Sequence, residues 1–450
     1  MATKRTVYRS PEARAASWLW RTARRRSVAV VGATAYLVAA LYYSFVWGLE
    51  GHGVKSWYTP GDIWLTFQVA TDVLHGHLGA VYAQYRFTTL PGIIVLLLPV
   101  AALTSGLHLT QDVVPSPIYT HPHAWVILGP YSWVISLVPL FASDALAERL
   151  GAGRRQRMVL AGVQVVALWQ VGVHFGHPED ALAVGLALYA LLFAFDGRWT
   201  GAGWLMGAAL AVQPLVLAVF PVFLAVAGVR RWGRLVVQGI VPPLAVLIGP
   251  LVANFHQTVS ALTLQPNYPL ADHETPWTAL APRVHIGVYA VAAGPGRVVS
   301  LALAIGIGWW AVRWKDRPEL IVWAASVALA LRCFTESVMD PYYLWPAIAV
   351  ALVASVLVSR ERFGLGLSLA VVISVTSQLQ LSWIAWWTLN LGLLSAILLC
   401  THTYPADLRQ RELELRSAGA WWRSAAPTGT GSRRAINERK RPQPAPARRR

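Results

Sequence analysis

The apolar positions of the chain fall in long runs that are separated by short polar or basic breaks. A helix that crosses a lipid bilayer needs about 20 predominantly apolar residues. The runs that approach or reach this length are 27–48, 124–147, 158–175, 180–196, 235–253, 293–314, 320–335, 342–359, 364–381 and 383–401. This pattern predicts an all-α polytopic membrane protein.

Two further apolar segments are not expected to form single membrane-spanning helices. Segment 201–228 is interrupted by Gln213-Pro214, and proline inside a helix removes a backbone donor and breaks or kinks it. We therefore expect a tight pair of short helices there. Segment 91–103 has the length of a re-entrant or interfacial piece.

The basic breaks between the runs set the expected topology. They lie at Arg149–Arg157, Arg198, Arg230–Arg234, Arg313–Arg317 and Arg360–Arg362, and the positive-inside rule places all of them in the cytoplasm. If segment 91–103 crossed the bilayer, the first of these breaks would fall outside. We therefore expect it not to cross, which gives about 12 spanning helices with both termini in the cytoplasm of a plasma-membrane protein.

Composition and charge agree with this interpretation. Hydrophobic residues make up 56% of the 450 residues and charged residues 13%, against about 25% charged in soluble proteins, which excludes a soluble enzyme. Most of the net charge of +17 lies in two tails, because residues 1–26 hold eight basic residues and residues 401–450 hold twelve. Such tails are typical of cytoplasmic flanks beside anionic lipid. A tail that binds DNA is the alternative, and we expect no nucleic-acid partner.

The predicted domains follow from these features. Residues 1–26 form a basic cytoplasmic tail, residues 27–401 the transmembrane domain, and residues 402–450 a second basic, disordered cytoplasmic tail. The first external loop, 49–123, contains the re-entrant or interfacial helices, and the other long external loop is 254–292. The cytoplasmic loops are too short to hold a catalytic domain, so we expect any chemistry on the external face.

Asp62 is the first candidate for chemistry. It follows Pro60-Gly61 and precedes an apolar stretch, 63–70, and an acid near lipid is costly unless it is paired or functional. In the functional interpretation it is a general base whose pKa rises through partial desolvation. The alternative is a helix N-cap, because an aspartate at a helix start accepts backbone N–H bonds.

Two further clusters of polar residues lie in predicted external loops. The segment HFGHPED contains His174, His177, Glu179 and Asp180, and RCFTESVMDPYYLWP contains Arg332, Glu336, Asp340, Tyr342 and Tyr343. An arginine near lipid is a natural partner for phosphate, although pairing with Glu336 one turn later is the alternative. The tyrosines could equally be interfacial aromatics, and the residues of the first cluster simply polar tips or the start of a helix.

No metal site and no cofactor are expected. His174 and His177 are three residues apart in a loop, which is a weak metal signal. Asp272, His273 and Glu274 are compatible with a metal, but adjacent side chains in a loop seldom converge on one ion.

Several motifs together resemble a known superfamily. After Asp62 come HGHLGAVYAQYRFTTLPGIIVLLLPVAAL, GHPEDALAVGLALYALLFAF, GAGWLMGAALAVQPLVLAVFPVFL and DPYYLWPAIAVAL. This order resembles the GT-C superfamily of integral-membrane glycosyltransferases, in particular the actinobacterial mannosyl- and arabinofuranosyltransferases, over residues 40–360. Many members have lysine where this chain has Gln213.

The resemblance implies a GT-C-like helix bundle that transfers mannose or arabinofuranose. The donor would be a polyprenyl-phosphate sugar, and the acceptor a glycolipid or polysaccharide of the cell envelope. Because a sugar phosphate already has a good leaving group, one carboxylate suffices as the base of an inverting displacement, and Asp62 fits this role. Candidates for binding the phosphate or the substrate are Lys55, Arg86, His174, His177, Asp180, Arg283, His285, Arg332, Glu336, Tyr342 and Tyr343.

A transporter or lipid flippase is the competing hypothesis. Transporters usually repeat a half-structure with broken helices at matching positions. The chain shows one proline-broken segment, around Pro214, and no matching partner in its second half. The pattern therefore favours the transferase.

Overall fold

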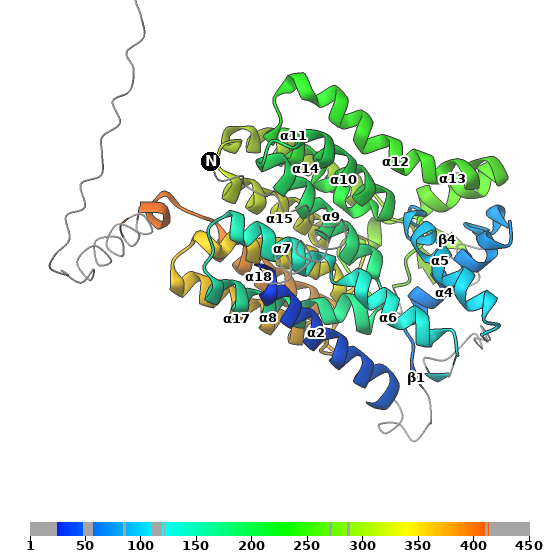
Figure 1. The fold of residues 1–450 in the computed structure, drawn as a ribbon. Helices are drawn as coiled ribbons and strands as arrows, with labels where there is room; N and C mark the ends of the chain where they lie inside the picture. The colour runs from blue at the N-terminus through cyan, green and yellow to red at the C-terminus, as the bar shows by residue number, and fades with distance from the viewer. Residues whose placement is uncertain are drawn as a thin grey trace, which may run out of the picture. The chain divides into compact units, whose positions relative to one another are not determined.

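The computed structural model describes residues 25–47, 57–83, 87–109, 119–120, 122–269, 272–285, 289–409 and 413. The chain divides into two compact units, Met1–Tyr404 and Pro405–Arg450. The described part of the first unit is mainly helical (Figure 1). Most of the two predicted basic tails lies outside the described residues, as do two predicted site residues, Lys55 and Arg86.

Eight helical segments among the described residues are long and apolar enough to cross a membrane. They contain α2 (Ser27–Tyr42), α6 (Trp125–Ser136) joined to α7 (Val138–Arg149), α8 (Arg154–Trp169), α9 (Pro178–Phe195), α12 (Trp232–Ala253), α14 (Gly296–Ala311), α15 (Pro318–Thr335) and α18 (Trp383–Thr401). Each coincides with a run predicted from the sequence. The prediction of an all-α polytopic membrane protein is confirmed.

Shorter helices fill the remaining positions. The segment broken at Gln213-Pro214 forms α10 (Trp199–Val212) and α11 (Phe220–Val226), joined by a 3-10 turn, η5 (Pro214–Ala218), so the predicted pair of short helices is confirmed. The others are α4 (Gly61–Leu74), α5 (Gly92–Gly106), α13 (Phe255–Leu264), α16 (Trp345–Ala354) and α17 (Arg360–Thr376). Every residue of α16 is buried, which places this helix in the centre of the bundle.

Small residues let neighbouring helices approach closely. A Cβ atom on Gly185 of α9 would lie 2.7 Å from the backbone nitrogen of Pro139 in α7. On α10, Gly203 and Gly207 are four residues apart and both face Gln238 of α12. Close backbone contact through small residues is a main source of helix association in membranes.

The predicted basic breaks gather at one end of the bundle, which we call the arginine end. An ion pair joins Arg149 to Asp196, and a cation–π contact joins the Arg231 guanidinium to the Trp199 ring. Hydrogen bonds join the Gln156 side chain to the Val356 carbonyl and Arg362 to the His402 carbonyl. The Trp323 ring contacts the rings of both Trp314 and His402. Helix ends that are distant in the sequence therefore meet there, as the alternation of runs and breaks predicts.

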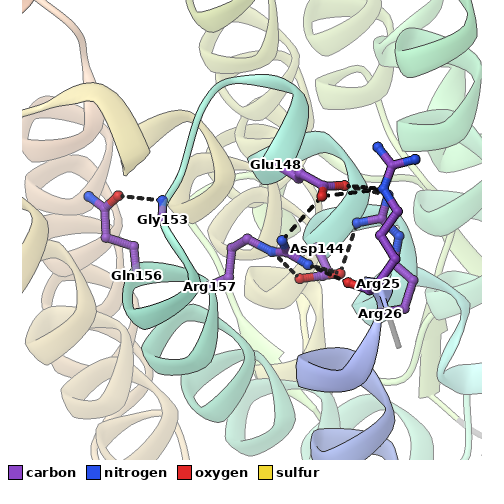
Figure 2. A network of polar contacts seen from close by, with 7 residues as sticks. All are labelled: Arg25, Arg26, Asp144, Glu148, Gly153, Gln156 and Arg157. Carbon is purple, nitrogen blue, oxygen red and sulfur yellow. Dashed lines mark hydrogen bonds and ion pairs between the residues drawn. The ribbon is translucent and has the colours of Figure 1, made fainter. Parts of the chain in front are cut away.

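An ion-pair network at the arginine end ties α2 to α7 and α8 (Figure 2). Asp144 binds the Arg157 guanidinium through two contacts of 2.6 and 2.8 Å and Arg26 through one of 3.0 Å. Glu148 pairs with Arg25, Arg26 and Arg157 at 2.8–3.4 Å. Two carboxylates of α7 thus hold three arginines from two other segments, the start of α2 and α8.

The opposite end, which we call the site end, carries the described strands. Three antiparallel pairs form: β1 (Trp57–Tyr58) with β2 (Tyr119–Thr120), β3 (His273–Glu274) with β6 (Val338–Met339), and β4 (Arg283–His285) with β5 (Tyr289–Val291). The pairing of β3 with β6 fixes the predicted loop 254–292 to the segment that follows α15. The other predicted loop, 49–123, contributes α4 and α5.

Candidate functional site

The imidazole of His177 lies between two carboxylates at the site end. Its Nε2 atom is 3.0 Å from Asp62 Oδ2, and its Nδ1 atom is 2.7 Å from Glu179 Oε1. Burial lowers the pKa of His177, but the charge of Glu179 and the hydrogen bonds with both carboxylates raise it by more, so the pKa lies well above its usual range. The two neighbouring carboxylates therefore favour the charged form of His177.

Asp62 lies in the first turn of α4, and its side chain is 60% exposed. The helix is capped by Pro60 without any side-chain hydrogen bond, so the alternative that Asp62 is an N-cap is wrong. Burial raises the pKa of Asp62, but the hydrogen bond and charge of His177 lower it by more, and the net direction is downward. Our expectation of a raised pKa is also wrong, because it did not include His177.

Glu179 and Asp180 both lie in the first turn of α9 and both are buried. The amide dipoles at a helix N-terminus stabilise such anions. Asp180 Oδ1 accepts a hydrogen bond of 2.5 Å from Gln213 Nε2, and Gln213 Oε1 accepts one of 2.7 Å from Thr89. Asp180 Oδ2 is buried without a hydrogen-bond partner in the described part of the chain. The break between α10 and α11 therefore delivers Gln213 to Asp180.

Two tyrosines connect His177 with Arg332. The Tyr342 ring stacks on the His177 ring with centroids 4.1 Å apart, and it meets the Tyr343 ring edge-on at 4.7 Å. The Arg332 guanidinium carbon lies 3.6 Å from the centroid of the Tyr343 ring, a cation–π contact. Both tyrosines are buried, so they are part of the bundle and not lipid-facing interfacial aromatics.

Arg332 shares its carboxylate partner with a second arginine. Its Nε atom is 3.3 Å from Glu336 Oε2, and Glu336 Oε1 is 2.8 Å from Arg297 Nε. The predicted alternative, pairing of Arg332 with Glu336, is confirmed. Because one carboxylate serves two guanidinium groups, this cluster retains a net positive charge.

A pair of acids lies where loop 265–292 meets the end of α15. His273 of β3 is opposite Met339 of β6, so the residues beyond this pair, Asp272 and Asp340, face each other, and each carboxyl group shifts the pKa of the other. Burial raises the pKa of both, and the charge of Asp272 raises that of Asp340 further. Both carboxyl groups are therefore harder to ionise than those of ordinary aspartates.

Within the described residues, no group of three or more histidine, cysteine, aspartate or glutamate side chains is arranged to hold a metal ion. The three adjacent candidates diverge: Asp272 turns to Asp340, and the His273 ring stacks on Trp386 at 3.9 Å. Glu274 belongs to β3.

The structure brings seven of the predicted site residues into one continuous region. They are Asp62, His177, Asp180, Arg332, Glu336, Tyr342 and Tyr343. Asp180 belongs to the region because the adjacent residue, Glu179, contacts His177. Of the other predicted residues, His174 borders this region, because the Phe175 ring contacts both the His174 ring and the Tyr342 ring. His174 stacks on Tyr58, whose hydroxyl donates a 2.6 Å hydrogen bond to the His174 carbonyl. Arg283 is exposed on β4 and has no ion-pair partner among the described residues. His285 ends β4, and its side chain lies outside the described part of the structure.

Four residues of this region were not among the predicted site residues. Glu179 and Asp340 were visible beside chosen candidates, and an arginine at the start of an apolar run was a signal for Arg297. No local signal marks Gln213 as a partner of Asp180. The chain matches none of the protein-family models and none of the curated proteins with which it was compared.

The site combines an exposed anion with partly buried cations. Asp62 is held ionised and oriented by His177, and the shared Arg297–Arg332 pair lies beyond the two tyrosines. Such an arrangement can accept a proton at one place and stabilise a developing anion at another.

Proposed function

We propose that this protein is a membrane glycosyltransferase of the GT-C type that transfers a sugar, mannose or arabinofuranose, from a polyprenyl-phosphate donor. The acceptor is a glycolipid or polysaccharide of the cell envelope. The observation that carries the proposal is the exposed Asp62 carboxylate, paired at 3.0 Å with the imidazole of His177. The order of motifs that resembles the superfamily supports it independently.

In the proposed reaction Asp62 removes the proton from an acceptor hydroxyl. The hydroxyl oxygen forms a bond to the anomeric carbon while the bond from that carbon to the phosphate oxygen breaks, and the polyprenyl phosphate leaves with the electron pair. The attack comes from the face opposite the phosphate, so the anomeric configuration inverts. The lowered pKa of Asp62 keeps the base ionised, and the hydroxyl becomes acidic only as the new bond forms.

His177 acts as a positioning residue in this scheme. Glu179 binds its Nδ1 atom and Tyr342 covers one face of its ring, so the imidazolium has little freedom to turn. Its Nε2 atom stays 3.0 Å from Asp62 Oδ2, so the charge of the imidazolium helps to hold the carboxylate in place. Preorganisation of this kind spares the reaction the cost of ordering the base.

The leaving phosphate needs positive charge, and the Arg297–Glu336–Arg332 cluster supplies it. The two guanidinium groups exceed the one carboxylate between them by one charge. Guanidinium groups bind phosphate through paired hydrogen bonds. In this proposal Arg332 stabilises the departing phosphate, and no metal ion takes part.

The proposed topology has 12 crossings, both termini in the cytoplasm, and the site end outside the plasma membrane. Its support is that the predicted basic breaks meet at the arginine end, because the positive-inside rule then places all of them in the cytoplasm. The test is labelling of single cysteines in Arg155→Cys and Gln380→Cys, both exposed positions, after replacement of Cys400 by serine. An impermeant reagent added to intact cells should label position 380 only; labelling of position 155 instead would refute the orientation.

A transporter or flippase without glycosyl transfer is the second candidate. The observation in its favour is the chain of titratable groups Asp62–His177–Glu179, because such chains mark ion and proton pathways in membrane proteins. One experiment separates the two functions. Purified protein in liposomes is given labelled polyprenyl-phosphate mannose or arabinofuranose with a glycolipid acceptor.

A transferase should form a labelled glycolipid whose anomeric configuration is opposite to that of the donor. Movement of the labelled lipid between leaflets without any product would favour the transporter. Product with retained configuration would contradict the single-displacement role of Asp62.

A further inference from the structure

A cavity with three arginines opens at the arginine end, where α10 and α12 begin. Its volume is about 440 Å³, and it is lined by residues 197–201 together with Arg231, Arg234 and Leu235. Arg198 comes from the first of these segments. This cavity lies at the opposite end of the bundle from the proposed catalytic site, so its role is independent of the proposed function.

The three arginines are held in place by neutral groups. Arg231 lies over the Trp199 ring at 4.9 Å, Arg234 donates a 2.6 Å hydrogen bond to Thr200, and Arg198 lies over a phenylalanine ring at 4.0 Å. In the described part of the chain, none of the three forms an ion pair with a carboxylate. Other arginines at this end, such as Arg149, do. The cavity therefore concentrates three uncompensated positive charges.

An apolar groove begins beside this cavity. Its volume is about 430 Å³, and it runs between α11 and α14, lined among others by Leu217, Phe220, Leu224, Leu301, Ile305 and Trp309. The linings of the two spaces contain consecutive residues at the start of α12. Arg231 lines the cavity, and the next residue, Trp232, lines the groove and donates a hydrogen bond to the Leu224 carbonyl.

The groove opens towards the side of the bundle that has least protein cover. In the most apolar part of the spans that contain α12 and α14, only 22% and 28% of the residues are buried inside the protein. These are the lowest values among the eight spans. Ile305 and Trp309 are 62% and 76% exposed. A hydrocarbon chain from the bilayer can therefore enter the groove from the side.

We propose that these two spaces together bind one anionic phospholipid. Its phosphate headgroup lies among Arg198, Arg231 and Arg234, and one acyl chain lies in the groove between α11 and α14. Guanidinium groups match phosphate oxygens, and basic pockets between transmembrane helices are suited to anionic headgroups. A soluble phosphate compound would leave the groove empty, and a neutral lipid would leave the three charges unbalanced.

Binding is measured by native mass spectrometry of the full-length protein in neutral detergent, with phosphatidylglycerol, phosphatidylcholine or inorganic phosphate. We expect phosphatidylglycerol to bind, phosphatidylcholine to bind at least ~10-fold more weakly, and inorganic phosphate at the same concentration not to displace the lipid. The variant with Arg198→Gln, Arg231→Gln and Arg234→Gln should lose about 100-fold in affinity, from about fivefold per arginine.

Matched controls use exposed residues outside both spaces. A variant with Arg154→Gln and Arg155→Gln removes charge from the same end and should keep its affinity. Leu301→Trp narrows the groove and should weaken lipid binding about 10-fold by excluding the chain, whereas Leu303→Trp, on the same helix but outside the lining, should not. Thermal unfolding of each variant checks that it is folded.

Three results would overturn the proposal. Equal binding of the two phospholipids would remove the role of the arginines. Equal losses in the cavity variant and in the Arg154/Arg155 control would show attraction by general surface charge. Displacement of phosphatidylglycerol by an equal concentration of inorganic phosphate would show an anion site without an acyl chain.

Discussion

Replacement of Asp144 by alanine should be among the most destabilising single changes at the arginine end. The Asp144 side chain is 2% exposed and that of Arg157 is 9% exposed. The carboxylate accepts two hydrogen bonds from Arg157 and one from Arg26. Asp144→Ala leaves the Arg157 guanidinium buried without its main counter-charge, as the contacts in Figure 2 make plain.

The size of this effect follows from burial. Removal of one partner of a buried ion pair costs about 3–5 kcal/mol, because the remaining charge is left desolvated. Asp196→Ala is the matched control at the same end, since this side chain is 41% exposed and its partner Arg149 is 46% exposed. An ion pair of that kind contributes about 1 kcal/mol or less, so the control should lose much less.

A double variant tests the physical reason. Asp144→Leu combined with Arg157→Met removes both buried charges and leaves apolar groups of similar size, which is often neutral for stability. The assay is reversible unfolding in mixed detergent micelles, read by circular dichroism. A loss below about 1 kcal/mol for Asp144→Ala, or a double variant less stable than that single one, would refute the reasoning from burial.

Three further changes have defined outcomes in the same unfolding assay. Because the pKa of His177 is raised in the folded protein, the free energy of unfolding of wild type should exceed that of His177→Gln by the full amount below about pH 6.5. This difference should fall, by at most about 1.4 kcal/mol per pH unit, as the pH rises through the raised pKa. Asp340→Asn keeps a hydrogen-bond donor for Asp272 but removes a group of raised pKa, so its stability relative to wild type should rise as the pH rises above about 4. Gln213→Leu removes the partner of Asp180 and should cost about 1–3 kcal/mol, whereas Gln213→Lys supplies a cation there and should not.

The outcomes that contradict these three expectations are equally defined. A difference between wild type and His177→Gln that grows with pH would reverse the sign of its pKa shift. An Asp340→Asn variant whose pH dependence equals that of wild type would show that the acid pair holds no extra proton. Equal losses in the two Gln213 variants would mean that the contact with Asp180 is unimportant for stability.

The helical framework was predictable because a bilayer permits few backbone structures. Apolar runs must form helices that satisfy their own backbone groups, so the ten long runs and the break at Pro214 located the helices correctly. The arginines between the runs marked the helix ends that meet at the arginine end. Exact ends differed by a few residues, as for α2, which passes into a π-helical turn at Tyr43.

The candidate site was predictable in its members but not in its connections. Asp62, His177 and Arg332 were chosen as polar residues in apolar surroundings, which is a local property. That His177 reaches Asp62, and that Arg297 shares Glu336, depends on how distant helices pack. The expected rise in the pKa of Asp62 was wrong for this reason, since burial could be guessed locally but the charged partner could not.

The most direct test of the proposed function is the turnover of Asp62→Asn with a polyprenyl-phosphate sugar donor. Asparagine keeps the shape of the side chain but cannot take a proton, and general-base catalysis contributes about 10²–10⁴-fold. We therefore predict at least a ~100-fold loss of turnover with donor binding retained, while Asp72→Asn on the same helix stays active. An Asp62→Asn protein that keeps more than about a tenth of wild-type turnover would contradict the assignment of Asp62 as the base.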